Sequence, residues 1–93
     1  MSKYKVMLSD RAEHDILRHR VLGSRAILQK IRTLLLELED HPRTGTGKPE
    51  LLVGCRKGQW SRRITQKHRL IYEIHESIVT VLLLSAWGHY DAK

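Results

Sequence analysis

The segment WSRRITQKHRLIY, residues 60–72, contains two alternating runs around a short polar break and therefore predicts a β-hairpin. With residues 66–68 as the loop, Thr65 lies opposite Arg69, because side chains alternate between the two faces of a strand. This register puts Arg63 and Arg69 on one face, in diagonal positions about 7–8 Å apart. The aliphatic side chains on the opposite face point toward a core: Ile64, Leu70 and Ile74.

Two arginines on one face of a sheet require an explanation, because like charges at that separation repel each other. A phosphate group between Arg63 and Arg69 would remove the repulsion. The alternative is a solvated strand face that keeps the protein soluble. The hairpin alone does not decide between these interpretations.

Positive charge is concentrated in the middle of the chain. The 93 residues include 17 Lys and Arg against 10 Asp and Glu, a net charge of +7, so the natural partners are polyanions or an acidic protein. Residues 41–72 hold eight basic side chains and one acidic side chain, Glu50. The single cysteine, Cys55, has no partner for an internal disulfide, and no segment is typical of a signal peptide or a membrane span. We therefore expect one soluble, cytoplasmic domain.

The remaining hydrophobic periodicities predict the other elements of the domain. They indicate, in order, a strand at residues 3–8, a helix at 10–20, a longer helix from Ser24 that stops at His41, a loop or short irregular strand at 43–58, and an inner strand at 78–84. The β-α-α-β-β-β order predicts a small α+β fold over residues 1–93, with two helices packed on one face of a mainly antiparallel sheet. The other face stays open and carries Arg63 and Arg69.

RNA can be cleaved when its own 2′-hydroxyl attacks the adjacent phosphate, and a protein assists with a base, an acid and cations. Arg63 and Arg69 can supply the cations. Glu50 can act as the base, and His89 can donate a proton to the departing 5′-oxygen. Composition alone favours a counterion role for Glu50 and an exposed tail position for His89. The other five histidines lack a spacing typical of a metal site, so we expect no metal and no cofactor.

Four short motifs resemble one known family. They are GTGKPELL at residues 45–52, WSRRIT at 60–65, HRLIY at 68–72 and HY at 89–90. Together they are similar to the YoeB/Txe branch of the RelE superfamily of bacterial toxins, in the right order and over nearly the whole chain. The resemblance implies a small α+β toxin of a toxin-antitoxin pair that cleaves mRNA on the ribosome without a metal and inhibits translation.

The resemblance also assigns roles to individual residues. Glu50 matches the family's general base, Arg69 the arginine that stabilises the transition state, and His89 the general acid. The residues expected to bind phosphate or RNA are Arg63, Lys48, Arg62 and Tyr90. Three departures from the family pattern leave codon preference and rate open: Val53 after the glutamate, Trp87-Gly88 before the histidine, and the extension Asp91-Ala92-Lys93.

The implied partners are an acidic antitoxin of the YefM/Axe type, the ribosome and mRNA. A flexible antitoxin segment is expected to cover the Arg63 and Arg69 face and to draw His89 away, since the polar tail around Gly88 buries little area. In the alternative, the antitoxin binds the helices on the other face. The rival functions are a basic RNA- or ribosome-binding module without catalysis, and a toxin of the same fold that poisons DNA gyrase. Neither needs the carboxylate, the arginine and the terminal histidine together.

Overall fold

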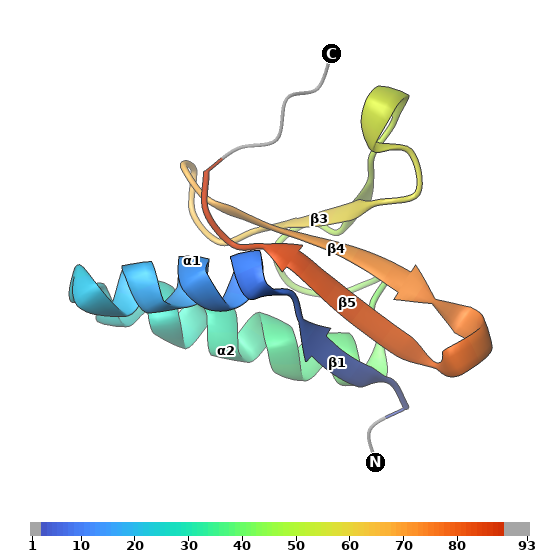
Figure 1. The fold of residues 1–93 in the computed structure, drawn as a ribbon, viewed down its shortest axis with the longest axis horizontal. Helices are drawn as coiled ribbons and strands as arrows, with labels where there is room; N and C mark the ends of the chain where they lie inside the picture. The colour runs from blue at the N-terminus through green and yellow to red at the C-terminus, as the bar shows by residue number, and fades with distance from the viewer. Residues whose placement is uncertain (1–2, 89–93) are drawn as a thin grey trace.

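The computed structural model describes residues 3–88, which form a two-layer domain with both helices on one face of a five-stranded sheet (Figure 1). The helices are α1 (Asp10–Val21) and α2 (Arg25–Asp40), and the strands are β1 (Lys5–Leu8), β2 (Glu50–Leu51), β3 (Trp60–Arg63), β4 (Arg69–His75) and β5 (Thr80–Ser85). The strand order is β1-β5-β4-β3-β2, with β1 parallel to β5 and the other neighbours antiparallel. The predicted α+β architecture is confirmed, and the sheet is mixed.

Local sequence signals place the two helices. The Ser9 hydroxyl accepts the backbone N–H of Ala12 at 3.0 Å, which satisfies one of the free donors at the start of α1. Between the helices, Gly23 adopts a positive φ of 73°, a conformation that glycine reaches without steric cost. Ser24 stands at the start of α2 as predicted, although its side chain makes no capping hydrogen bond.

The core lies between the sheet and the helices. Leu34 and Leu38 of α2 pack against side chains from the inner strands, among them Leu70, Tyr72 and Leu83, and all five are fully buried. Each buried leucine contributes about 1.5–3 kcal/mol relative to exposure, so this contact fixes which face of the sheet is covered. Leu70 and Tyr72 alternate with Arg69 and Ile71 along β4, and Arg69 therefore belongs to the face away from the helices.

The hairpin register differs from the prediction. Arg63 pairs directly with Arg69, and residues 64–68 form a longer loop than the expected 66–68. The Thr65 hydroxyl accepts the backbone N–H groups of Lys67 and His68, both at 3.1 Å, and so closes the turn earlier than we expected. Because the register moves by two positions, every side chain keeps its face. The two arginines do share a face, but they are directly opposite rather than diagonal.

The run at residues 78–84 also differs from the prediction at its start. β5 is the inner strand that we expected, with β1 and β4 as neighbours, but it begins at Thr80. Ile78, the last residue of a short 3₁₀ helix, and Val79 are exposed, and Val79 has a left-handed φ of 48°. The apolar side chains of these two residues therefore pack on neither face of the sheet.

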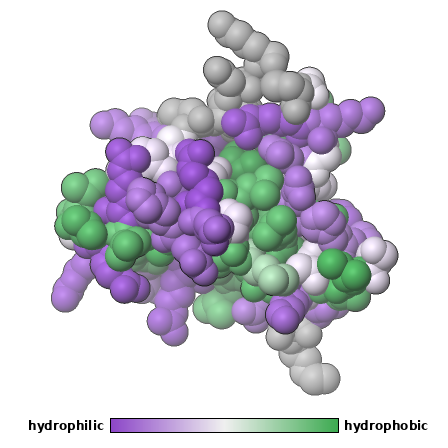
Figure 2. All heavy atoms as spheres, viewed as in Figure 1, coloured by the Kyte–Doolittle hydropathy of each residue, from purple (hydrophilic) through white to green (hydrophobic). Residues whose placement is uncertain are grey.

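The surface over the helices is mixed in character. Figure 2 shows hydrophilic side chains over much of α1 and apolar spheres at its far end, where Val21 and Leu22 are exposed. Within residues 3–88, neither helix combines the length and the apolar character that crossing a bilayer requires.

Candidate active site

Glu50 and the two arginines lie on the same face of the sheet. In β2, Glu50 pairs with Ser61 of β3, and Arg63 follows two residues later on that face. Arg69 of β4 lies directly opposite Arg63. Leu70, on the alternate face, is in the helix-covered core. The fold thus brings the predicted base and both predicted cations together on the face away from the helices.

This face is less open than the sequence suggested. Arg63 and Arg69 are half-buried and Glu50 is exposed, whereas Ser61 and Ile71 between them are buried. Two buried polar atoms on this face, Arg63 Nε and Ser61 Oγ, have no hydrogen-bond partner among the described residues. A buried donor on a guanidinium can bind a phosphate oxygen at no cost in broken protein hydrogen bonds.

Arg62 does not belong to this face, and its predicted role in binding RNA is corrected. The side chain is 0% exposed and points into the helix-covered layer. Nη1 donates to Glu37 Oε1 at 2.8 Å, and Nε donates to the Tyr72 hydroxyl at 3.2 Å. The remaining donors bind the backbone carbonyl oxygens of His41 and Thr44 at 2.6 Å and of Thr46 at 3.3 Å. The two neighbours in the motif WSRRIT therefore have opposite roles, because successive side chains alternate between faces.

These contacts hold the loop that leads to Glu50. Glu37, on α2, accepts the backbone N–H of Thr46 at 2.8 Å and its hydroxyl at 2.6 Å, in addition to the bond from Arg62. Burial alone would raise the pKa of Glu37, but the hydrogen bonds from Thr46 and Arg62 outweigh it and hold the pKa below its ordinary value of 4.5. We refer to Arg62, Glu37 and the three carbonyl groups as the Arg62 anchor.

Gly47 brings the same loop against β3. Its carbonyl accepts the backbone N–H of Arg63 at 2.7 Å, and its φ is 86°. A Cβ atom at this position would lie 2.8 Å from the Arg63 carbonyl oxygen, so the close approach requires glycine. Lys48, the predicted RNA-binding lysine, follows with an exposed side chain two residues before Glu50.

The predicted acid, His89, and Tyr90 lie outside the described residues. The segment before them is described, and it is held more firmly than the sequence suggested. Ala86 is fully buried; its N–H donates to Asp15 Oδ2 at 3.0 Å, and its carbonyl accepts His19 Nε2–H at 2.9 Å. The expectation that little opposes a shift of the tail is therefore wrong for residues 86–88.

A second set of contacts comes from the hairpin. The Gly88 N–H donates to His68 Nδ1 at 2.9 Å, and the Gly88 carbonyl accepts the Arg69 N–H at 3.0 Å. The Trp87 ring packs against the rings of His19 and His68, with centroid separations of 4.6 and 4.5 Å. The tail thus passes directly beside one of the two site arginines.

Sequence analysis missed Asp15 and His19. They are 2% and 1% exposed, on the face of α1 that also carries Ala12 and Ile16. The helical spacing of Ala12 and Ile16 was visible in the sequence. The two polar residues on the same face of the helix were the signal that could have indicated buried polar groups. Buried polar side chains require partners, and here the partner is the backbone of Ala86.

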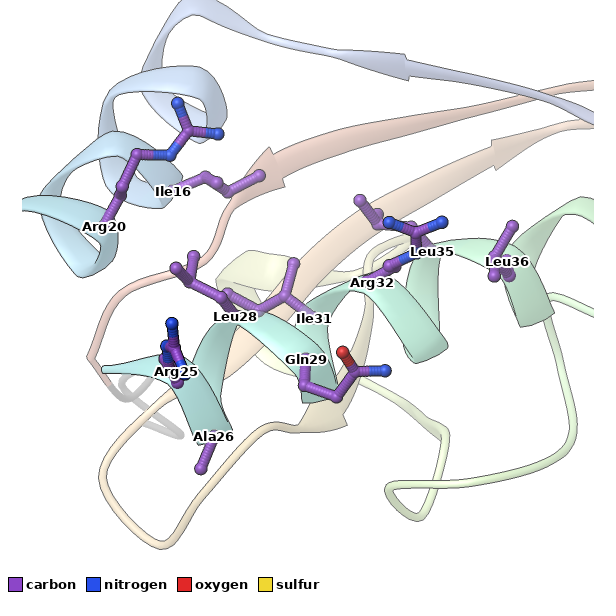
Figure 3. A pocket seen from close by; sticks show the side chains of 10 residues that line it. All are labelled: Ile16, Arg20, Arg25, Ala26, Leu28, Gln29, Ile31, Arg32, Leu35 and Leu36. Atoms are coloured by element: carbon purple, nitrogen blue, oxygen red, sulfur yellow. The ribbon is translucent and has the colours of Figure 1, made fainter. Parts of the chain in front are cut away.

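A groove of about 870 Å³ lies between α1 and α2, in the layer of helices (Figure 3). Its floor is apolar and its rim carries arginines; the side chains that define it are Ile16, Leu28, Leu35, Arg20, Arg25 and Arg32. Of the predicted catalytic residues, the structure describes Glu50 and Arg69, and neither lines this groove. Among residues 3–88, no three His, Cys, Asp or Glu side chains are grouped so that they could hold a metal ion.

Comparison with known proteins gives consistent matches. The family model for the YoeB-like toxin of the bacterial type II toxin-antitoxin system matches residues 11–90. A toxin YoeB from Mycobacterium bovis is 42% identical over 68 residues, which cover 73% of this chain and 78% of the relative. The solved YoeB/ParE toxin from Agrobacterium tumefaciens has a TM-score of 0.85 at 30% identity, over 92% of this chain and 99% of that chain. A chain of the heterotetrameric YoeB-YefM toxin-antitoxin complex from Staphylococcus aureus has a TM-score of 0.78 at 28% identity, over 96% and 100%.

Proposed function

The chain belongs to the YoeB-like family of toxins from bacterial type II toxin-antitoxin systems, and from this premise we propose that it cleaves mRNA on the ribosome by attack of the RNA's own 2′-hydroxyl. Family identity supports ribosome-dependent endoribonuclease activity, with inhibition of translation as its result. The observation that carries the mechanism is the common face of Glu50, Arg63 and Arg69. This arrangement offers a base and two cations to one phosphate.

Each step of the proposed reaction uses a named group. Glu50 accepts the proton of the 2′-hydroxyl as its oxygen attacks phosphorus. Arg69 and Arg63 stabilise the negative charge that develops on the phosphoryl oxygens. As the bond from phosphorus to the 5′-oxygen breaks, His89 donates a proton to that oxygen. The products are a 2′,3′-cyclic phosphate, which water can open to a 3′-phosphate, and a 5′-hydroxyl.

Lys48 and Tyr90 complete the proposed RNA contacts. Lys48 is exposed beside Glu50, where an ammonium group can bind a neighbouring phosphate. The net charge of +7 favours association with the ribosome, whose surface is rich in phosphate, and binding of this kind weakens as salt increases. A toxin that acts on translating ribosomes works in the cytoplasm.

We also propose an acidic antitoxin as the partner, as the complex of the Staphylococcus aureus relative suggests. Its flexible segment covers the Arg63 and Arg69 face, where a carboxylate can replace phosphate. The rival surface is the groove between α1 and α2, with Arg32 on its rim. Measured affinities separate the two: Arg63→Glu should weaken antitoxin binding more than Arg32→Glu, and the reverse order would assign the antitoxin to the helices.

The central experiment measures cleavage of mRNA on purified ribosomes by mapping new 5′ ends. Glu50→Gln, Arg69→Ala and His89→Gln should each fold and lose about 10²- to 10⁴-fold in rate, the usual contribution of an acid or base group or of a cation that stabilises the developing charge. The matched controls are Asp40→Asn and His14→Gln, exposed side chains on the helices, which should cleave at the wild-type rate. Wild-type rates in all three site variants would overturn the proposed roles.

A modified substrate tests the nucleophile. An mRNA with a 2′-deoxy or 2′-methoxy group at the cleaved nucleotide should bind the ribosome-toxin complex and remain intact. Efficient cleavage of that RNA, or a product with a 3′-hydroxyl, would indicate a different nuclease chemistry. Growth arrest without any new mRNA ends would instead favour the non-catalytic binding module or the toxin that poisons gyrase.

A further inference from the structure

A group of three polar residues around the tail, all buried or half-buried, has no role in the proposed chemistry. Asp15 and His19 lie on the core side of α1, and His68 is the first residue of the HRLIY motif. All three bind the backbone of residues 86–88, immediately before the proposed acid. We call Asp15, His19 and His68 the tail clamp.

The hydrogen-bond partners in this cluster determine which ring nitrogen atoms of the two histidines carry a hydrogen. The Ala86 carbonyl can only accept, so Nε2 of His19 carries a hydrogen. The Gly88 backbone N–H can only donate, so Nδ1 of His68 is without a hydrogen. Asp15 accepts from the Ala86 N–H and also from Arg11 Nε at 3.2 Å. Each bond to the tail is thus directional and specific to one backbone group.

Moving the tail would break these bonds in a buried setting. Asp15 and His19 are almost fully buried, so water cannot readily replace Ala86 as their partner. Leaving buried polar groups unsatisfied costs about 1–3 kcal/mol each. The Gly88 carbonyl is bound to the Arg69 N–H, so the last residue of the described tail is fixed beside that arginine.

We propose that the tail clamp positions the acid: Asp15, His19 and His68 fix the backbone of residues 86–88 and so set where His89 stands relative to Arg69. This proposal rests on the proposed function, because it assumes that His89 protonates the 5′-oxygen. The three residues are positioning residues, since they act through the tail and touch no reacting atom. Any antitoxin-induced displacement of His89 then either begins after Gly88 or breaks the tail clamp.

The first test compares two substitutions at His68, which is half-buried in the hairpin loop. His68→Ala removes the acceptor for the Gly88 N–H, whereas the side-chain oxygen of His68→Asn can take the place of Nδ1. His68→Ala should lower kcat by about 10- to 100-fold with little change in KM, since a displacement of about 1 Å is worth up to 10²-fold. His68→Asn should recover most of that loss.

An RNA with sulfur at the leaving position distinguishes a misplaced acid from a general loss of activity. When the 5′-bridging oxygen of the cleaved bond is replaced by sulfur, the thiolate leaves without a proton. His68→Ala and His89→Gln should therefore cleave this RNA at close to the wild-type rate, while Glu50→Gln stays slow. Slow cleavage of both RNAs by His68→Ala, or wild-type cleavage of both, would overturn the proposal. Failure of the wild-type protein to cleave either RNA would instead refute the proposed function.

A second readout does not depend on activity. Hydrogen exchange of the Ala86 and Gly88 amides should become faster in Asp15→Ala and His68→Ala, while amides at the centre of β4 and β5 exchange as before. Asp15→Asn, which keeps an acceptor oxygen, and His14→Ala, an exposed control on α1, should resemble the wild type. Unchanged exchange at Ala86 and Gly88 in both alanine variants would overturn the tail clamp whatever the RNA assays show.

Discussion

The segments that lead to the two proposed proton-transfer residues are held in different ways. The loop before Glu50 depends on the Arg62 anchor, in which one buried guanidinium binds a carboxylate and several carbonyl groups. The tail before His89 depends on separate bonds from α1 and from the hairpin, each to a single backbone group. The first support is concentrated in one side chain, and the second is distributed over several.

This difference predicts that the first support affects the stability of the fold, whereas the second affects the position of one segment. When the central cation of a buried ion pair is removed, its carboxylate and the carbonyl groups lose their partners at the same time. When one member of a distributed set is removed, the other bonds remain and the segment shifts rather than detaches. We therefore expect changes in the Arg62 anchor to act on folding and changes around the tail to act on local order.

The largest expected effect is that of Arg62→Met. Methionine fills part of the same volume but leaves Glu37 without its buried cation, so the free energy of unfolding should fall by about 3–5 kcal/mol. Urea unfolding followed by circular dichroism measures this loss. The neighbouring variant Arg63→Met is the matched control and should change the stability by less than about 1 kcal/mol, because Arg63 is half-exposed on the other face. Equal losses in both variants would remove the distinction between the two arginines.

The same pair of arginines shows what the sequence could and could not predict. Alternation along β3 predicted the face of Arg63, and the aliphatic residues around it predicted the core, because both depend on local periodicity. The same alternation puts Arg62 on the core side, but we expected this residue to bind RNA, and arginine side chains are rarely fully buried. Its burial depends on Glu37, 25 positions away in sequence, and local patterns carry no information about such a partner.

The tail shows the same limit. Gly88 and the polar residues near it suggested a loosely held end, and this expectation is wrong for residues 86–88. The bonds from Asp15 and His19 span about 70 positions, and they form because β5 ends beside α1. The hairpin loop was mispredicted for a more local reason: the Thr65 hydroxyl closes a turn that strand alternation alone does not reveal.

A smaller effect is expected when acid titrates the Arg62 anchor. The folded-state pKa of Glu37 lies below 4.5, so its contribution to stability is present above that pH and is lost as the pH falls through the folded value. Over this acidic range, Glu37→Gln should lose less stability than the wild type in urea unfolding. In the control Glu76→Gln, the dependence of the free energy of unfolding on pH should change less. Hydrogen bonds from Tyr4 and Arg43 also lower the pKa of Glu76, but at an exposed site. Parallel curves for wild type and Glu37→Gln would mean that this carboxylate does not support the loop.

The smallest expected effect concerns the outer side of the tail. The guanidinium carbon of Arg18 lies 3.8 Å from the centre of the Trp87 ring, a cation-π contact at an exposed site that is worth about 0.5–1 kcal/mol. Because the support of the tail is distributed, Arg18→Ala should leave the free energy of unfolding unchanged within error. The Gly88 amide should exchange about two to five times faster, the factor that corresponds to that energy. Arg20→Ala, an exposed arginine on the same helix that faces the groove instead, should leave this exchange rate as it is. If Arg18→Ala lowered global stability as much as Arg62→Met, the tail would be supported by one residue, and the contrast between the two segments would fail.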